Sequence, residues 1–232
     1  ITNGMATSAG GGLRIISSSP TLRNLTISGN SAPSGGGVFC GEESSPILTY
    51  VTISGNTAFG SNTGYGCGGG IKCKDSSNPT LKDVIISDNS VTASNEGGGG
   101  ICCDASSPNL DMVTISNNSS NASGGGVYCD NASSPSFNNV NIINNSTMGI
   151  GGGVWFRNSS NPNLTNIKIS SNTAKSGGGI CFGTYSTGHL KNVLISGNHA
   201  VGNQSEDGNG GGIWSTVGAS PVIENVTIIF FK

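Results

Sequence analysis

The stretch GGGICCDASSPNLDMVTISNN, residues 98–118, joins a glycine run, two adjacent cysteines, a Ser-Ser-Pro turn and a strand-like V-T-I-S segment. The same phrase recurs along the chain. The last glycine of each run stands at Gly12, Gly37, Gly70, Gly100, Gly126, Gly153, Gly179 and Gly212, at intervals of 25 to 33 residues. Repetition at this period indicates a solenoid, a propeller or an array, in which each repeat packs against its neighbours. The repeat therefore has to be interpreted before any single motif is given a chemical role.

The composition of the repeat favours a β-solenoid. Only 9% of the 232 residues are charged, 39 are glycine, and the formal net charge is −2. Short segments of alternating β-branched residues recur with turn residues between them, which is the pattern of strands. A repeat of this length suits one coil with two or three short strands, and coils stack about 4.8 Å apart. The eight glycine runs thus predict one all-β domain, a single-stranded parallel β-helix of about eight coils, over residues 1–232.

The alternation of side chains along a strand predicts which of them face the interior. Four of the seven cysteines stand three residues after a glycine run, at an interior position: Cys40, Cys73, Cys103 and Cys129. Their Cβ atoms would stack in parallel about 4.8 Å apart, wider than a disulfide prefers, and the cysteines lack zinc-type spacing. We expect four buried thiols and no metal site. The other three, Cys67, Cys102 and Cys181, are expected to be accessible to solvent.

A second strand in each repeat ends in the pattern Ile-x-x-Asn. The asparagine occurs in seven successive repeats, at Asn30, Asn56, Asn89, Asn118, Asn145, Asn172 and Asn198. A stacked amide can hydrogen-bond to backbone groups and to the amides above and below it. We therefore predict a structural asparagine ladder at one corner of the coil. The glycine runs are predicted to form another corner rather than a phosphate loop, because no Lys-Ser/Thr pair follows them.

The pairing of GGGVFC with VTISGN, and of GGGICF with VLISGN, resembles the repeats of secreted bacterial right-handed parallel β-helix proteins. These include surface proteins that are exported with a separate C-terminal sorting domain. The pairing is also similar to the repeats of chlamydial polymorphic outer membrane proteins, with isoleucine here in place of their phenylalanine. The resemblance covers essentially the whole chain. It implies a right-handed β-helix and a role in surface display or adhesion, and it supplies no catalytic residues.

The outward face of the first strand is the candidate ligand-binding surface. Its residues are Lys72, Lys74, Asp104, Tyr128, Asp130, Trp155, Arg157 and Trp214. Aromatic faces on a polar sheet suit sugar rings, and charged neighbours can bind hydroxyl or uronate groups. The structural alternative is that the stacked Lys74, Asp104, Asp130 and Arg157 neutralise one another, and that the aromatic residues are ordinary strand formers.

Asp104 and Asp130 also raise the alternative of a carbohydrate-active enzyme, either a polysaccharide lyase or a glycosidase. Carboxyl groups on neighbouring coils would lie about 5 Å apart, as in a retaining glycosidase. Such a pair needs one protonated acid, however, and the adjacent Lys74 and Arg157 favour ionisation of both. The two histidines, His189 and His199, have no matching nucleophile. We assign no catalytic residue and no cofactor.

The longer repeats gain residues at one place, in 57–67, 90–96 and 199–209. These insertions are expected at one edge, which solenoids commonly use for binding. At the last repeat, Phe231 stands where the ladder asparagine would be. The ends favour a segment of a longer protein, and the alternative is a subunit that stacks head to tail into a filament.

Taken together, these features predict an extracellular or cell-surface module with a structural or adhesive role. Its partners would be surface glycans or other copies of itself. A net charge of −2 predicts no nucleic-acid partner, and no apolar run is long enough for direct membrane insertion.

Overall fold

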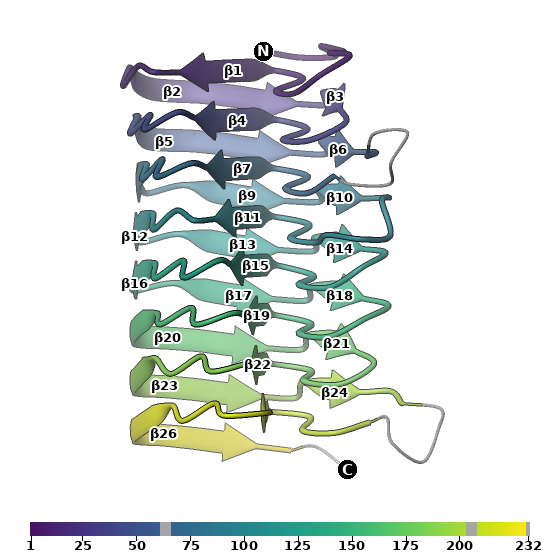
Figure 1. Cartoon of the computed structure of the whole chain (residues 1–232), viewed down its shortest axis with the longest axis vertical. Helices are drawn as coiled ribbons and strands as arrows, with labels where there is room; N and C mark the ends of the chain where they lie inside the picture. The colour runs from purple at the N-terminus through teal and green to yellow at the C-terminus, as the bar shows by residue number, and fades with distance from the viewer. Residues whose placement is uncertain (61–65, 203–207, 231–232) are drawn as a thin grey trace.

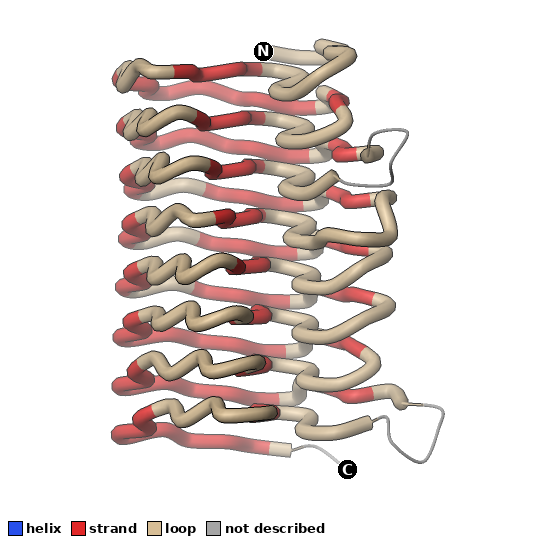
Figure 2. Tube along the Cα trace, in the orientation of Figure 1, coloured by secondary structure: helices blue, strands red, loops and turns tan. Residues whose placement is uncertain are grey.

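Each repeat forms one coil, and the coils stack along a single axis with equivalent residues in register. The computed structural model describes residues 1–60, 66–202 and 208–230. Within these ranges the chain consists of strands, turns and loops, and there is no helix that could cross a membrane (Figures 1 and 2). The predicted all-β parallel solenoid is confirmed. Eight strands stack in one sheet and seven in another, so the coils complete about seven turns.

The first sheet begins directly after the glycine runs, and its strands pair in parallel. Its members are β1 (Leu13–Ile16), β4 (Val38–Gly41), β7 (Ile71–Lys74), β11 (Ile101–Asp104), β15 (Val127–Asp130), β19 (Val154–Phe156), β22 (Ile180–Phe182) and β25 (Ile213–Ser215).

The second sheet follows the Ser-Pro turn. It comprises β2 (Thr21–Ser28), β5 (Ile47–Ser54), β8 (Thr80–Lys82), β9 (Ile85–Ser87), β12 (Asn109–Asp111), β13 (Thr114–Ser116), β16 (Ser136–Asn138), β17 (Asn141–Ile143), β20 (Asn163–Ser170), β23 (His189–Ser196) and β26 (Val222–Ile229). Three coils split this strand at a residue with positive φ, namely Asp83, Met112 and Asn139.

The third sheet follows the ladder asparagine, and each of its strands has two residues. They are β3 (Ser31–Ala32), β6 (Thr57–Ala58), β10 (Ser90–Val91), β14 (Ser119–Ser120), β18 (Ser146–Thr147), β21 (Thr173–Ala174) and β24 (His199–Ala200). The predicted insertions therefore begin with strand residues. The other described residues of the insertions follow this sheet on one side of the solenoid (Figure 1). Residues 61–65 and 203–207 of the insertions lie outside the described ranges.

The interior is a set of stacked side chains from all three sheets. The predicted cysteine ladder is confirmed, because Cys40, Cys73, Cys103 and Cys129 pair in register and are at most 1% exposed. The hydrogen bond with the next cysteine along the stack and burial raise the pKa of the Cys73 and Cys103 thiols well above the ordinary value, and the hydrogen bond with the preceding cysteine lowers it by less. These cysteines therefore serve as small apolar core residues.

The asparagine ladder is also confirmed, and Asn118 illustrates its bonding. Its Oδ1 accepts hydrogen bonds from the backbone N and from Nδ2 of Asn89, at 3.0 and 2.9 Å. Its own Nδ2 donates to Oδ1 of Asn145 and to the carbonyl of Ile86, both at 3.0 Å. The same bond from Nδ2 to Oδ1 joins all seven amides, from Asn30 to Asn198. Phe231, at the next ladder position, lies outside the described residues.

A second polar ladder was missed at sequence level and lies in the Ser-Pro turn. The backbone N of Ser44 donates to Oγ of Ser77, and that of Ser77 donates to Oγ of Ser106, each at 3.1 Å. Ser106 and Ser133 continue the series at 3.0 Å. Buried hydroxyls thus satisfy buried amides at this corner, as the asparagines do at the other.

The three glycines of a run have different roles at the first-sheet corner. The first of the final three adopts positive φ, as in Gly98 at 77° and Gly124 at 62°. The last has no such backbone but lacks space, since a Cβ on Gly126 would lie 2.6 Å from the carbonyl oxygen of Gly153. A Cβ on Gly98 or Gly124 would also clash, at 2.1 and 2.6 Å from a backbone carbonyl oxygen, so close apposition applies to both positions and left-handed backbone only to the first.

Candidate functional site

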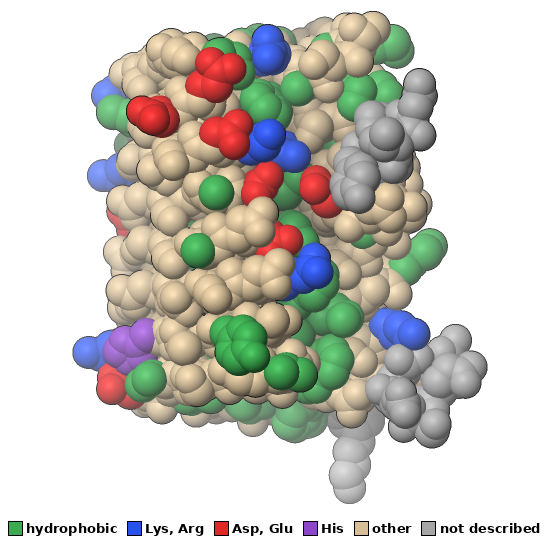
Figure 3. Space-filling view, in the orientation of Figure 1, with side chains coloured by type: hydrophobic (Ala, Val, Ile, Leu, Met, Phe, Trp, Pro, Cys, Tyr) green, Lys and Arg blue, Asp and Glu red, His purple; other side chains and the backbone are tan. Residues whose placement is uncertain are grey.

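The candidate site is built on the outward column of the first sheet, defined as the second residue of each of its strands. In chain order the column is Arg14, Phe39, Lys72, Cys102, Tyr128, Trp155, Cys181 and Trp214. These side chains alternate with the interior ladder, so the predicted facing is correct. The column lies on the face that Figure 3 presents to the viewer, where acidic and basic side chains gather in the upper half.

Solvent access to this column differs from the prediction. Tyr128 is only 3% exposed and Lys72 only 8%, whereas Trp155 and Trp214 are half-buried. A small apolar cluster outside the main core contains Cys67, Cys102 and Tyr128, with Trp155 packed against it. The expectation that Tyr128 and Lys72 form an open binding surface is therefore wrong, because other segments cover this part of the sheet.

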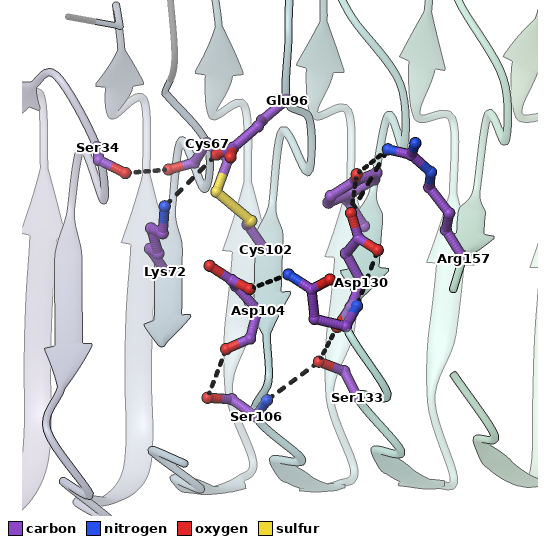
Figure 4. The surroundings of a disulfide bond; sticks show 12 residues. Ser34, Cys67, Lys72, Glu96, Cys102, Asp104, Ser106, Asp130, Ser133 and Arg157 are labelled. Carbon is purple, nitrogen blue, oxygen red and sulfur yellow. Dashed lines mark hydrogen bonds and ion pairs between the residues drawn. A yellow bond between two sulfur atoms is a disulfide. The ribbon is translucent and has the colours of Figure 1, made fainter. Parts of the chain in front are cut away.

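Cys67 closes the cluster through a disulfide with Cys102, across 35 residues (Figure 4). Its carbonyl accepts hydrogen bonds from the backbone N of Gly35 and from Oγ of Ser34. Both disulfide cysteines and Cys181 are at most 1% exposed. The expectation of accessible cysteines is therefore wrong at all three positions. Cys67 and Cys102 are covered because they bond to each other on the outer side of the sheet, and Cys181 is buried as a free thiol.

Lys72 is paired at the edge of this cluster. Its Nζ lies 3.5 Å from Oε2 of Glu96, and the two side chains are 10% and 29% exposed. Glu96 directly precedes the next glycine run. The same carboxylate and the Sγ atoms of Cys67 and Cys102 lie within 4.8 Å of one another. Among the described residues, these three are the group of His, Cys, Asp or Glu side chains whose potential metal-ligand atoms lie this close together.

Tyr128 and Asp130 make a hydrogen-bonded network with Arg157 on the next coil (Figure 4). The Tyr128 hydroxyl donates to Oδ2 of Asp130 at 2.8 Å, and Nη1 of Arg157 donates to the same hydroxyl at 3.3 Å. Nη1 also lies 3.5 Å from Oδ2 of Asp130. Burial raises the pKa of Tyr128 above its ordinary value, Arg157 opposes this shift, and Asp130 adds to it. Tyr128 is thus a protonated donor within a polar cluster.

The two aspartates lie on neighbouring coils in register, as predicted. The Oδ1 atom of Asp130 accepts from Nδ2 of Asn158 at 2.7 Å and from the backbone N of Asn131 at 2.8 Å. Nδ2 of Asn131 in turn donates to Oδ1 of Asp104 at 2.7 Å. Both carboxylate oxygens of Asp130 therefore have partners, and Asn131 connects the two aspartates through its backbone N on Asp130 and its side-chain amide on Asp104.

The predicted series of stacked charges is partly correct. Lys74, Asp104 and Asp130 follow one another in register, and Arg157 pairs with Asp130. The ion pair of Lys74, however, is with its neighbour Asp75, at 3.6 Å. Arg157 therefore pairs with an aspartate of the series and also contacts Tyr128 and Trp155, whereas Lys74 pairs with a residue outside the series.

Trp155 is the aromatic residue of the site that keeps exposed surface. Its ring lies 5.3 Å from that of Tyr128 in an edge-to-face arrangement, and Cζ of Arg157 lies 5.5 Å from the indole centroid. Trp214 is two coils further along the column, beyond Cys181. The structure therefore brings Tyr128, Asp130, Trp155 and Arg157 together and leaves Trp214 apart.

An acidic hollow on the first coils was not predicted. It has a volume of about 650 Å³ and is lined by Ser17, Ser18, Ser19, Glu42, Glu43 and Asp75. Oγ of Ser17 donates to Oε2 of Glu42 at 2.9 Å. Its lining residues lie beyond the ends of β1, β4 and β7, several coils from Trp155, so it is separate from the predicted surface.

Comparison with known proteins agrees with this architecture. A family model described as a right handed beta helix region matches residues 1–122 and 91–228. The comparisons with curated proteins and with solved structures gave no match. Because the two matched ranges together extend over most of the sequence, the chain belongs to the right-handed β-helix family.

Proposed function

We propose that this chain is an extracellular structural or adhesive module of the surface type seen in secreted bacterial β-helix proteins, and that it binds glycans without cleaving them. The disulfide between Cys67 and Cys102 supports the location, because disulfides persist in oxidising environments and are rare in the cytosol. The stacked asparagine and serine ladders support a structural role, since they satisfy buried polar groups in coil after coil.

The arrangement around Trp155 carries the proposal of glycan binding. An indole with exposed surface can stack on the apolar face of a sugar ring. The guanidinium of Arg157, whose side chain is 42% exposed, lies over the indole ring with its Cζ 5.5 Å from the centroid, and it can reach a hydroxyl or carboxylate of a sugar bound beside it. Tyr128, on the preceding coil, supports both groups through its edge contact with Trp155 and its hydrogen bond with Arg157. A sugar bearing a carboxylate suits this pair of groups best.

The bonding of the two aspartates favours binding over hydrolysis. A glycosidase needs one carboxyl group that donates a proton and a second that attacks or activates water. Asp130 accepts hydrogen bonds from Tyr128, Asn158 and the backbone N of Asn131 and pairs with Arg157, so both of its carboxylate oxygens are already engaged. Asp104 is bound to the side chain of Asn131. The glycosidase alternative is therefore the weaker one.

A glycan array that includes uronate-containing oligosaccharides tests the proposal, with the wild type and Trp155→Ala compared on each sugar that binds. By analogy with stacking of bases on aromatic side chains, the loss is expected to be about 1–3 kcal/mol, or roughly 5- to 150-fold in Kd. Tyr50→Ala is the matched control, because Tyr50 is 61% exposed and lies on the second sheet. Equal binding by the wild type and Trp155→Ala would contradict the proposal.

Incubation of the bound sugars with the protein separates binding from catalysis. We expect the oligosaccharides to be recovered intact. Cleavage that disappears in both Asp104→Asn and Asp130→Asn would instead support the enzyme.

A further inference from the structure

We propose that Cys67, Cys102 and Glu96 form a binding site for a thiophilic divalent cation, with Zn²⁺ as the best fit, when the disulfide between the two cysteines is reduced. The three residues come from different places in the chain. Cys67 and Glu96 end the segments that precede two successive glycine runs, and Cys102 is the second residue of β11. The fold brings their ligand atoms within 4.8 Å of one another.

The distances suit a small tetrahedral site. Zinc binds thiolate sulfur at about 2.3 Å and carboxylate oxygen at about 2.0–2.2 Å, so two sulfur ligands lie roughly 3.8 Å apart around the ion. The Cα atoms of Cys67 and Cys102 are 5.8 Å apart. Once the S–S bond is broken, the two sulfurs can move apart by rotation of their side chains. The Glu96 carboxylate already lies within 4.8 Å of both sulfurs. Three protein ligands leave the fourth position to water or to an external ligand.

The neighbouring charge is appropriate for such a site. Two thiolates and one carboxylate carry three negative charges, of which Zn²⁺ neutralises two. The remaining charge is balanced by Lys72, whose Nζ lies 3.5 Å from Oε2 of Glu96 (Figure 4). Lys72 is 8% exposed, so the ions would be partly shielded from water and their pairing matters more than on an open surface.

The chemical steps balance with a dithiol as the reductant. The disulfide accepts two electrons and two protons, and the dithiol becomes its own disulfide. Metal binding then releases the two thiol protons, because thiolates are the ligands. The oxidised protein has neither thiolate and is not expected to form the site. Oxidation state would thus decide between a covalent cross-link and a metal cross-link at the same place.

Cobalt(II) titration of the reduced protein tests the site directly. The protein is reduced with dithiothreitol, freed of reductant by desalting without air, and titrated with Co²⁺. We expect one Co²⁺ per chain, with absorption from thiolate-to-cobalt charge transfer that Zn²⁺ abolishes by displacement. Oxidised wild type should give no such band. Far-ultraviolet circular dichroism follows the strands throughout, and loss of the strand signal on reduction would overturn the proposal, because the ligands would no longer be assembled.

Three variants assign the ligands. Cys67→Ser combined with Cys102→Ser should abolish the charge-transfer band, whereas Cys181→Ser, a buried cysteine of the same column, should leave it unchanged. Glu96→Gln should bind Co²⁺ more weakly, on the order of 10- to 100-fold. A band that persists in the double serine variant would overturn the proposal and assign binding to the interior cysteine ladder. Unchanged affinity in Glu96→Gln would overturn the three-ligand site.

Discussion

Over its middle coils the first sheet is buried from solvent on both sides, but for different reasons. On the inner side, Cys73, Cys103 and Cys129 stack in register and are closed off by the rest of every coil. On the outer side, Lys72, Cys102 and Tyr128 stack in the same register and are 8%, 1% and 3% exposed. Their cover is local, because it depends on Cys67 and on the packing of Trp155. Alternation along a strand thus determines which side of a sheet a residue takes, and other segments determine whether water reaches it.

The largest contrast is expected between two adjacent residues of β19. Phe156 points into the core and is fully buried, where it stacks on Phe182 at 5.3 Å, while Trp155 points outward and is half-buried. Phe156→Ala should lower the free energy of unfolding by about 4 kcal/mol, since a cavity remains in a packed interior. Trp155→Ala should lower it by about 1 kcal/mol, because its place is open to water. Denaturant titration measures both, and equal losses would mean that the outer cluster is a second core.

Removal of the disulfide tests how far the cross-link itself keeps Cys102 and Tyr128 buried on the outer side of the sheet. Cys67→Ser combined with Cys102→Ser should lower the free energy of unfolding by about 3 kcal/mol, because the cross-link spans 35 residues and restricts the unfolded chain. The same variant should increase the fluorescence quenching of Trp155 by iodide, as the adjacent cover loosens. Cys181→Ser, which breaks no cross-link, is the control. Unchanged stability in the double variant would show that the cover does not need its covalent bond.

A smaller effect is expected from one hydroxyl group. Tyr128→Phe removes the donor to Asp130 and the acceptor from Arg157 while it keeps the ring. We expect a loss of about 1 kcal/mol in unfolding free energy, since Asp130 retains its other donors. Tyr50→Phe changes the same group at a 61% exposed site and should have almost no effect. A loss in Tyr50→Phe as large as that in Tyr128→Phe would contradict the structural role of the network.

The smallest effect is expected at Cys181, whose thiol should react only slowly with an alkylating reagent in the folded protein. Burial raises the pKa of this thiol from about 9 to about 12, so at pH 8 the folded protein holds it as the unreactive thiol. Iodoacetamide should modify it only slowly, as judged by intact mass. Since the folded pKa is the higher one, its contribution to stability is complete below pH 9 and is lost progressively between pH 9 and pH 12. Rapid labelling at pH 8 would indicate that the outer column is open at Cys181.

The fold was predictable because its determinants repeat. The interior isoleucines and the seven asparagines occur at the same place in each repeat, so every coil provides independent evidence for the same strand and corner. The strands of the third sheet were not assigned from sequence, because a two-residue segment such as Ser31–Ala32 is too short for a period to be detected. Backbone pairing with the next coil defines them instead.

The candidate site was less predictable because its determinants occur only once. Cys67 precedes one glycine run, and Cys102, 35 residues later, lies in the strand that follows the next run. Nothing in the repeat indicates that these two residues meet. The pairing of Asp130 with Arg157 was predictable, since both stand at the same place in successive repeats. The burial of Tyr128 was not, because it depends on an insertion and on the shape of its neighbours rather than on the repeat.

The asparagine ladder gives the solenoid an electrical direction. Each amide donates from Nδ2 to the Oδ1 of the following coil, so all of the amide dipoles from Asn30 to Asn198 point the same way along the axis. Aligned hydrogen bonds in a low-dielectric interior polarise one another, and their dipoles add. Each further coil therefore lengthens the dipole. Reversal of a single amide would place two donors face to face on one side and two acceptors on the other, which makes the ladder an all-or-none arrangement along its whole length.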